Sequence, residues 1–306
     1  MTVRSSLYTA KFIYTLPSTT LTLDQVDGVD PSTNATEAEI IPGGAVDRAH
    51  VGIGSASPTV GLRTRDLVTF FGTVSATAGL AVAGASTFYF QRRDDGGTFK
   101  TGSSNHSYTS TNGFLRPTTI TASQDDTDGA MLQSEFTPLW DGTTTEPLVH
   151  NASVDIDSEA TPAFNSRFFL GPVYHNAAQL DGITSITVDY GINYVAEAFN
   201  GDAYAKTGAI VTRQPVFTFV TKDWAVGAAL DMFGRTVTSS LAIYLQKGLA
   251  GGTREPAAST VHCKIGCTAG YWRLDEASVQ GTEDGQQTFS VRPTGTITTV
   301  TNSAIP

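Results

Sequence analysis

Alternation of apolar and polar residues is clearest between residues 183 and 196, where it continues for ten positions without a break. One side of this segment is apolar: Ile186, Val188, Tyr190, Ile192 and Tyr194. The other side is polar or small: Ser185, Thr187, Asp189, Gly191 and Asn193. A period of two over this length predicts one long antiparallel strand with a buried face and a wet face.

A second strand is predicted over residues 209–220. Pro215 interrupts it, and because proline has no N–H, this position implies a sheet edge or a bulge. Asn200-Gly201-Asp202 lies between the two segments and predicts a turn. Residues 183–220 are therefore expected to form one extended hairpin.

One helix is predicted from an Asp223 N-cap to Gly234 in the C′ position. Its apolar residues fall on one face at helical spacing. They are Val226, Ala229, Leu230 and Phe233. We expect this face to cover a sheet.

Most of the remaining chain reads as short strands separated by turns. The predicted strands are residues 7–16, 21–23, 67–74, 87–90, 118–122, 130–139, 148–156, 168–174, 241–245, 261–267 and 288–300. The stretch between Asp66 and Arg92 carries no charge and is long enough to cross a bilayer. Its many Thr, Ser and Gly residues favour two buried strands over a transmembrane helix.

Two segments do not fit this strand pattern. Residues 27–65 are rich in Gly, Pro and Ala and have little periodicity, which indicates a long loop or an extended arm. Residues 92–130 begin with a tight-turn signal at Asp94-Asp95-Gly96-Gly97 and are a possible outward insertion. The sequence as a whole predicts a mainly β single domain over residues 1–306, an antiparallel β-sandwich with one flanking α-helix.

Composition supports this fold class and excludes some functions. The 306 residues include 45 threonines, 24 serines and 30 glycines, which favour strands and turns. The formal net charge is −10 and the pI is near 4.8, so tight binding to nucleic-acid phosphates is disfavoured. The first 17 residues contain no continuous apolar segment, and we expect no secretory signal there.

Candidate catalytic and metal-binding chemistry is weak. His262, Cys263 and Cys267 offer three soft ligands where a structural zinc site needs four, so we expect buried thiols. The acidic run 125–129 resembles the start of a calcium loop with Glu135 six residues after Gly129, but no flanking helices are predicted. Acid pairs for glycoside hydrolysis could be drawn from Asp155, Asp157 and Asp189, but carboxylates that alternate along strands are commonly just the solvent face. We expect no catalytic residue, no cofactor and no metal.

Four passages resemble recurrent segments of tailed-bacteriophage tail tube proteins, the major tail protein family. They are Phe168-Phe169-Leu170-Gly171-Pro172-Val173, residues 180–192, Asn200-Gly201-Asp202-Ala203-Tyr204, and Ile210-Val211-Thr212-Arg213-Gln214-Pro215 leading into residues 217–223, with a looser likeness over residues 96–139. About a fifth of the chain carries the clear resemblance.

The resemblance implies a structural virion protein and not an enzyme. In that family, hexameric rings stack into a tail tube, and long hairpins from six subunits join into one inner β-barrel. Such a barrel needs an apolar outer face and a polar lumen face. On this basis Ser185, Thr187, Asp189 and Asn193 would face the lumen.

The implied partners are other copies of the chain, a tape measure protein, and tail terminator or tip proteins. Phage DNA would pass without sequence-specific binding, no membrane would be involved, and the protein would occur in the virion tail and, during assembly, in the host cytoplasm. A capsid decoration or tail-completion protein is the alternative. A carbohydrate-active β-sandwich enzyme with Trp140 or Trp272 as a sugar platform is the third possibility.

Overall fold

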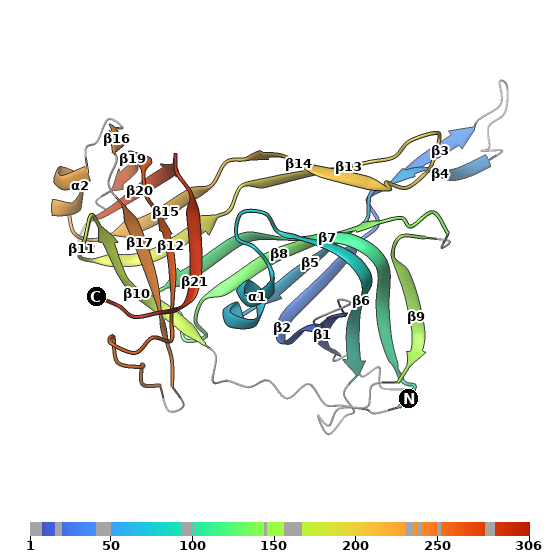
Figure 1. Cartoon of the computed structure of the whole chain (residues 1–306), viewed down its shortest axis with the longest axis horizontal. Coiled ribbons are helices and arrows are strands. Elements are labelled where there is room, and N and C mark those ends of the chain that lie inside the picture. The colour runs from blue at the N-terminus through green and yellow to red at the C-terminus, as the bar shows by residue number, and fades with distance from the viewer. Residues whose placement is uncertain are drawn as a thin grey trace.

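The structure is a computed structural model that describes residues 8–15, 20–40, 50–92, 100, 102–143, 146–155, 167–230, 235–237, 240–249, 252–278 and 285–306. Strands dominate it, and all strand pairs between its named elements are antiparallel (Figure 1). The predicted mainly β fold is confirmed. No helix in the described residues is both long enough and apolar enough to span a membrane.

The N-terminal half forms a sheet that closes on itself. Among the described strands the order is β7-β6-β1-β2-β5-β8, and β8 pairs back to β7. Their bounds are β1 (Tyr8–Thr15), β2 (Thr20–Ser32), β5 (Thr59–Thr64), β6 (Leu80–Arg92), β7 (Asn105–Ser123) and β8 (Met131–Leu139). Buried Leu62, Phe88 and Phe136 belong to the core, and the rings of Phe88 and Phe136 lie 5.4 Å apart. We call this unit the closed sheet.

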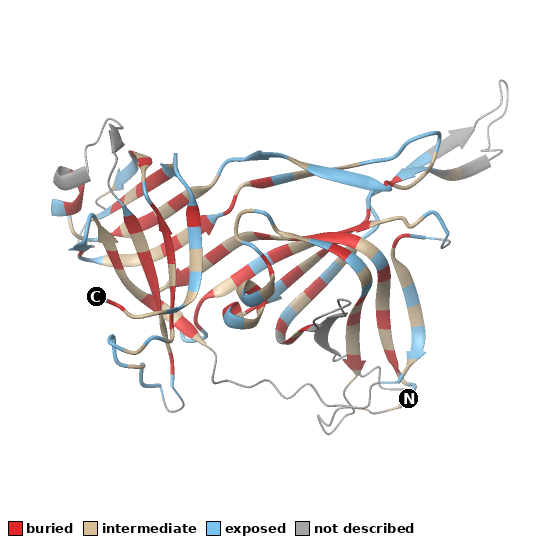
Figure 2. Ribbon diagram, viewed as in Figure 1, coloured by how far each residue is buried: buried red, intermediate tan, exposed pale blue. Residues whose placement is uncertain are grey.

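The C-terminal half forms a sandwich that grows out of the closed sheet. The end of β7 pairs with β12 (Ile183–Asp189), which continues through β15 (Val216–Thr221), β20 (Gln286–Pro293), β19 (Gly270–Ser278) and β16 (Arg235–Val237). The facing sheet has the order β11 (Ala178–Leu180), β10 (Phe168–His175), β17 (Leu241–Lys247), β18 (His262–Cys267) and β21 (Ile297–Ser303). Buried residues form stripes along both units (Figure 2).

Several strand predictions are confirmed, including residues 130–139, 168–174 and 241–245. The predicted strand over residues 288–300 is wrong as a single element, because β20 and β21 belong to different sheets. β9 (Val149–Val154) pairs with the start of β7.

The strand predicted over residues 67–74 is wrong, because this segment is the helix α1 (Leu67–Thr73). The Asp66 side chain accepts a hydrogen bond from the Thr69 N–H at 3.1 Å and caps the helix. Leu67 and Phe70 are buried, and the helix packs against β2 and β21. It therefore helps to fill the junction between the closed sheet and the sandwich (Figure 1).

The two irregular segments are also strands. Residues 27–65, predicted as a loop or arm, contain the end of β2, a hairpin of β3 (Ala35–Ile40) and β4 (His50–Ala56), and β5. Residues 92–130, predicted as a possible insertion, contain β7, which pairs with β6, β8, β9 and β12. β7 is thus the strand that joins the two halves.

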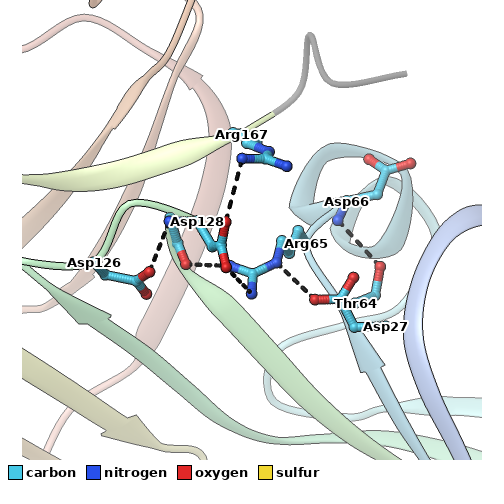
Figure 3. A network of polar contacts seen from close by, with 8 residues as sticks. Asp27, Thr64, Arg65, Asp66, Asp126, Asp128 and Arg167 are labelled. Atoms are coloured by element: carbon cyan, nitrogen blue, oxygen red, sulfur yellow. Dashed lines mark hydrogen bonds and ion pairs between the residues drawn. The ribbon is translucent and has the colours of Figure 1, made fainter. Parts of the chain in front are cut away.

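An ion-pair network ties the closed sheet to the sandwich (Figure 3). Arg65 Nε lies 2.7 Å from Asp27 Oδ2, and Arg65 Nη1 donates to the Gly129 carbonyl oxygen at 2.6 Å. Asp128 Oδ1 lies 3.6 Å from Arg167 Nη1, just before β10. In the acidic turn that resembled a calcium loop, the Asp128 carboxylate thus pairs with Arg65 and Arg167. Glu135 pairs with Arg116 at 2.6 Å.

The predicted helix is present as α2 (Ala225–Leu230), and the residues that follow Leu230 up to its predicted end at Gly234 lie outside the described part of the chain. Asp223 Oδ1 accepts from the Ala225 N–H at 2.8 Å, and Val226 is buried near β19. The side chains of Ala229 and Leu230, and the whole of Phe233 and Gly234, lie outside the described residues.

Val226→Asp is expected to lower the free energy of unfolding by about 3 kcal/mol, because a carboxylate would replace a buried apolar side chain. Ala225→Asp is the matched control, since Ala225 is exposed on the same helix, and it should change stability by less than about 0.5 kcal/mol. Urea unfolding of the two variants measures the difference. Equal stabilities would show that α2 does not cover the sheet.

Candidate assembly surface

The predicted long hairpin is present, but it is jointed. β12 and β15 form its inner part within the large sheet, whereas β13 (Ile192–Glu197) and β14 (Thr207–Arg213) form its outer part. The outer part is a separate two-stranded sheet that runs from the sandwich over the closed sheet (Figure 1). The prediction of one unbroken strand over residues 183–196 is therefore wrong at residues 190–191. We call β13 and β14 with their connecting loop the outer hairpin.

The break between β12 and β13, at residues 190–191, lies beside the break between β14 and β15, at residues 214–215. Gly191 has φ +58°, and a Cβ there would lie 2.1 Å from the Gln214 carbonyl oxygen. The Gln214 N–H donates to the Gly191 carbonyl at 2.9 Å, and Asp189 Oδ1 accepts from the Gly191 N–H at 2.8 Å. Pro215 follows directly, at the interruption predicted from the sequence. We call residues 190–191 and 214–215 the joint.

The two predicted faces persist across the joint. Ile186 and Val188 of β12, Tyr190 of the joint and Ile192 of β13 are all buried, although β12 and β13 belong to different sheets. Tyr194, the fifth residue of the apolar face, is half-buried and stacks on Phe114 of β7 with ring centroids 4.2 Å apart. The apolar face of the outer hairpin therefore rests on the closed sheet.

The structure divides the predicted lumen-facing residues between two strands. Ser185, Thr187 and Asp189 lie on β12, whereas Asn193 lies on β13. Ser185 and Thr187 are half-buried, and Asp189 and Asn193 are exposed. Thr187 pairs with Thr121 and Thr218 on the adjacent strands, so this face is a band of short hydroxyl side chains.

No other strand in the described part of the chain covers the two long edges of the outer hairpin. Among the strands that the structure describes, β13 and β14 pair only with each other. Three large apolar side chains are exposed on it: Val195, Phe199 and Val211, the last at 61%. Exposed strand edges beside apolar side chains are characteristic of surfaces that pair with another chain.

The apolar exposure on β14 was missed at the sequence level. Ile210 and Val211 are consecutive, and neighbouring side chains on a strand point to opposite faces. Only one of them can pack on the body of the protein, and the structure packs Ile210 against the core. This pair of adjacent apolar residues was the available signal.

The predicted turn at the tip is confirmed. Asn200 and Gly201 have φ values of +59° and +79°, and the Asp202 N–H donates to the Phe199 carbonyl at 3.0 Å. Two successive positive φ angles are typical of a type I′ turn, which matches the twist of a hairpin.

A second hairpin, β3 with β4, projects beyond the closed sheet (Figure 1). Within the described part of the chain these strands pair only with each other. The Ala56 N–H at the end of β4 donates to the Ala203 carbonyl at 2.9 Å, so the base of this hairpin touches the tip of the outer hairpin. The two exposed hairpins are thus adjacent.

The cysteines are buried and free, as predicted. Burial raises the pKa of the Cys263 thiol to about 12 and also raises the pKa of Cys267. His262 Nδ1 accepts from the Lys247 N–H at 3.1 Å, so its proton lies on Nε2 and bonds the Pro256 carbonyl. In the described residues, no group of three His, Cys, Asp or Glu side chains could hold a metal ion.

Neither thiol should react with a maleimide in the folded protein at pH 8, because both are buried and almost wholly protonated. Both should react once the protein is unfolded in guanidinium. Mass spectrometry before and after denaturation measures the labelling. Rapid labelling of either thiol in the native protein would contradict their position in the sandwich core.

No protein-family model matches this sequence, and no curated protein does either. The functional assignment therefore depends on the surfaces of the chain itself.

Proposed function

We propose that this chain is a structural subunit of a phage tail tube, in which copies assemble into hexameric rings that stack into a conduit for DNA ejection. The observation that carries the proposal is the outer hairpin, with its two open edges and its division into an apolar and a polar face. Open edges can pair with the same edges of identical copies. A rotation that closes on itself turns such contacts into a ring.

The polar face suits a channel through which DNA passes. Ser185, Thr187, Asp189 and Asn193 are short side chains without a positive charge, and the whole chain carries a net charge of −10. Basic side chains on this face would bind passing phosphates, and these residues would not. The joining of hairpins from several copies into one inner barrel is part of the proposal.

The β3–β4 hairpin is the proposed contact between rings, because stacking needs a projecting element that meets a different surface of the next ring. A tape measure protein and tail terminator or tip proteins are the further proposed partners. The protein would act without catalysis, in the virion tail, after assembly in the host cytoplasm.

A capsid decoration or tail-completion protein is the second candidate. In such a protein the polar face would lie on an outer surface, whereas in a tail tube it would line the channel. The third candidate, a carbohydrate-active enzyme, would need an exposed tryptophan on which a sugar can stack, and Trp272 is not exposed. Trp272 is 1% exposed and packs between His175 and Phe219, so it cannot stack on a ligand from solvent. Trp140 carries the Lys206 ammonium 4.5 Å above its ring.

Labelling of Asn193→Cys distinguishes a lumen from an outer surface. We expect the free subunit to react with both a small maleimide and a large polyethylene-glycol maleimide. In the assembled form only the small reagent should react, because the large one cannot enter the channel. The native thiols are buried and give little background. Reaction with the large reagent after assembly would place this face outside and favour the decoration protein.

A further inference from the structure

The outer hairpin occupies a defined docking site on the closed sheet of its own chain. Its middle is held by the stacking of Tyr194 on Phe114. Near its tip, the Ala205 carbonyl accepts from the Trp140 N–H at 2.8 Å, and the Ala203 carbonyl accepts from the Ala56 N–H. The site thus combines aromatic contact with directional backbone hydrogen bonds, which makes it specific for this hairpin.

The root of the hairpin is held by a charged group. The Arg116 guanidinium on β7 donates to the Ile192 carbonyl at the start of β13. The same guanidinium pairs with Glu135 of β8 at 2.6 Å. Because the ion pair with Glu135 fixes the position of the Arg116 guanidinium, this group could donate the same hydrogen bond to the Ile192 carbonyl of another copy.

Packing beneath the hairpin is incomplete. A groove of about 430 Å³ that is open to solvent lies along β6, β7 and the hairpin, and its lining includes Ala81, Val82, Leu139 and Ile210. Along an open groove the hairpin has fewer packing partners than side chains in a closed interior have, so this interface gains less dispersion energy than a closed core. The hairpin is therefore held more weakly than the strands of either sheet.

The joint allows the hairpin to move as a unit. Only residues 190–191 and 214–215 connect it to β12 and β15, and the outer two-stranded sheet shares no strand pairing with the large sheet among the described strands. Short connections of this kind favour the exchange of an element between identical copies. Every docking contact can then be made again by a neighbour at little cost.

We propose that neighbouring copies exchange this element: on assembly the outer hairpin of one subunit leaves its own closed sheet and docks on the same site of a second copy. This inference rests on the proposed function, because it describes how the subunits of a ring are joined. The exchange keeps the docking contacts and changes only the conformation of the joint. In a closed ring, each subunit donates its hairpin to one neighbour and receives a hairpin from the other.

Two single-cysteine variants test the exchange in the full-length protein. Ala56 and Tyr204 are partners in a β-bridge between the body and the hairpin, so cysteines at these positions would lie about 5 Å apart between Cα atoms, within disulfide range. Ala56→Cys and Tyr204→Cys proteins are mixed before assembly and then oxidised. We expect disulfide-linked dimers in the mixture and none in either variant alone.

The double variant Ala56→Cys/Tyr204→Cys provides the complementary result. Oxidised as a monomer, it should form an intrachain disulfide and fail to assemble, and reduction should restore assembly. Rings that form without mixed dimers, or an oxidised double variant that assembles normally, would overturn the exchange and leave the proposed function standing. A protein that stays monomeric under all conditions would overturn both.

Discussion

Val211→Asp should abolish assembly while leaving the subunit folded. Val211 is the most exposed of the large hydrophobic residues described, and its truncation or charging removes no core contact in the single chain. Exposed substitutions of this kind usually change stability by less than about 0.5 kcal/mol. In a ring, however, the edge of β14 would pair with a strand of a neighbour, and Val211 would pack beside the side chain opposite it on that strand, where a carboxylate would lose part of its hydration.

Sedimentation velocity over a range of protein concentrations measures this effect. The matched control is Val68→Asp on α1, because Val68 is also exposed, at 39%, but lies on a helix away from the outer hairpin. We expect the control to assemble as the natural protein does. Normal assembly of Val211→Asp would show that β14 is not part of the subunit interface.

Gly191→Ala should destabilise the subunit by about 2 kcal/mol or more. Two effects add at this position, namely the positive φ of +58° and the clash of a Cβ with the Gln214 carbonyl oxygen at 2.1 Å. The clash is with the backbone of the other segment of the joint, so relief requires residues 190–191 and 214–215 to separate.

Gly201→Ala measures the cost of a positive φ angle without a clash. Gly201 has φ +79°, but a Cβ there would meet nothing within 4 Å. This control should cost about 1 kcal/mol, from the positive φ alone. Urea unfolding measures both variants, and equal losses of stability would mean that the joint is loosely packed.

The sequence predicted the faces of the hairpin and the interruption at Pro215, but not the break at residues 190–191, for one physical reason. Alternation reports which side of a strand is buried, and even-numbered residues from Ile186 to Ile192 stay buried on both sides of the break. The change of direction depends on a single φ angle at Gly191, which alternation cannot reveal. Gly191 was assigned to the polar face because its position fits the period.

Local composition misled the prediction where tertiary contacts decide the structure. The segment predicted as a possible insertion contains Gly113 and Pro117, residue types that are common in turns, yet both lie within β7. A Cβ at Gly113 would lie 2.2 Å from the Phe136 ring, so glycine is needed there for close packing and not for a turn. The apolar residues after Asp66 were predicted as a strand, but they form a helix. The signal for the helix was the Asp66 side chain, which caps it by accepting a hydrogen bond from the Thr69 N–H.

The open edges of the outer hairpin follow from topology and not from residue type. β13 and β14 read as ordinary strands, and only the sheet order shows that their sole partners among the described strands are each other. The proposed assembly surface could therefore be inferred from the sequence only in part, through the two-faced pattern of residues 185–194.

Electron microscopy of the purified natural protein is the most direct test of the central claim. We predict rings at low concentration and stacked tubes at high concentration, with an open channel along the axis and Asn193 on its wall. A uniform population of single subunits across concentrations and salt conditions, including after addition of tail initiator proteins, would contradict the account.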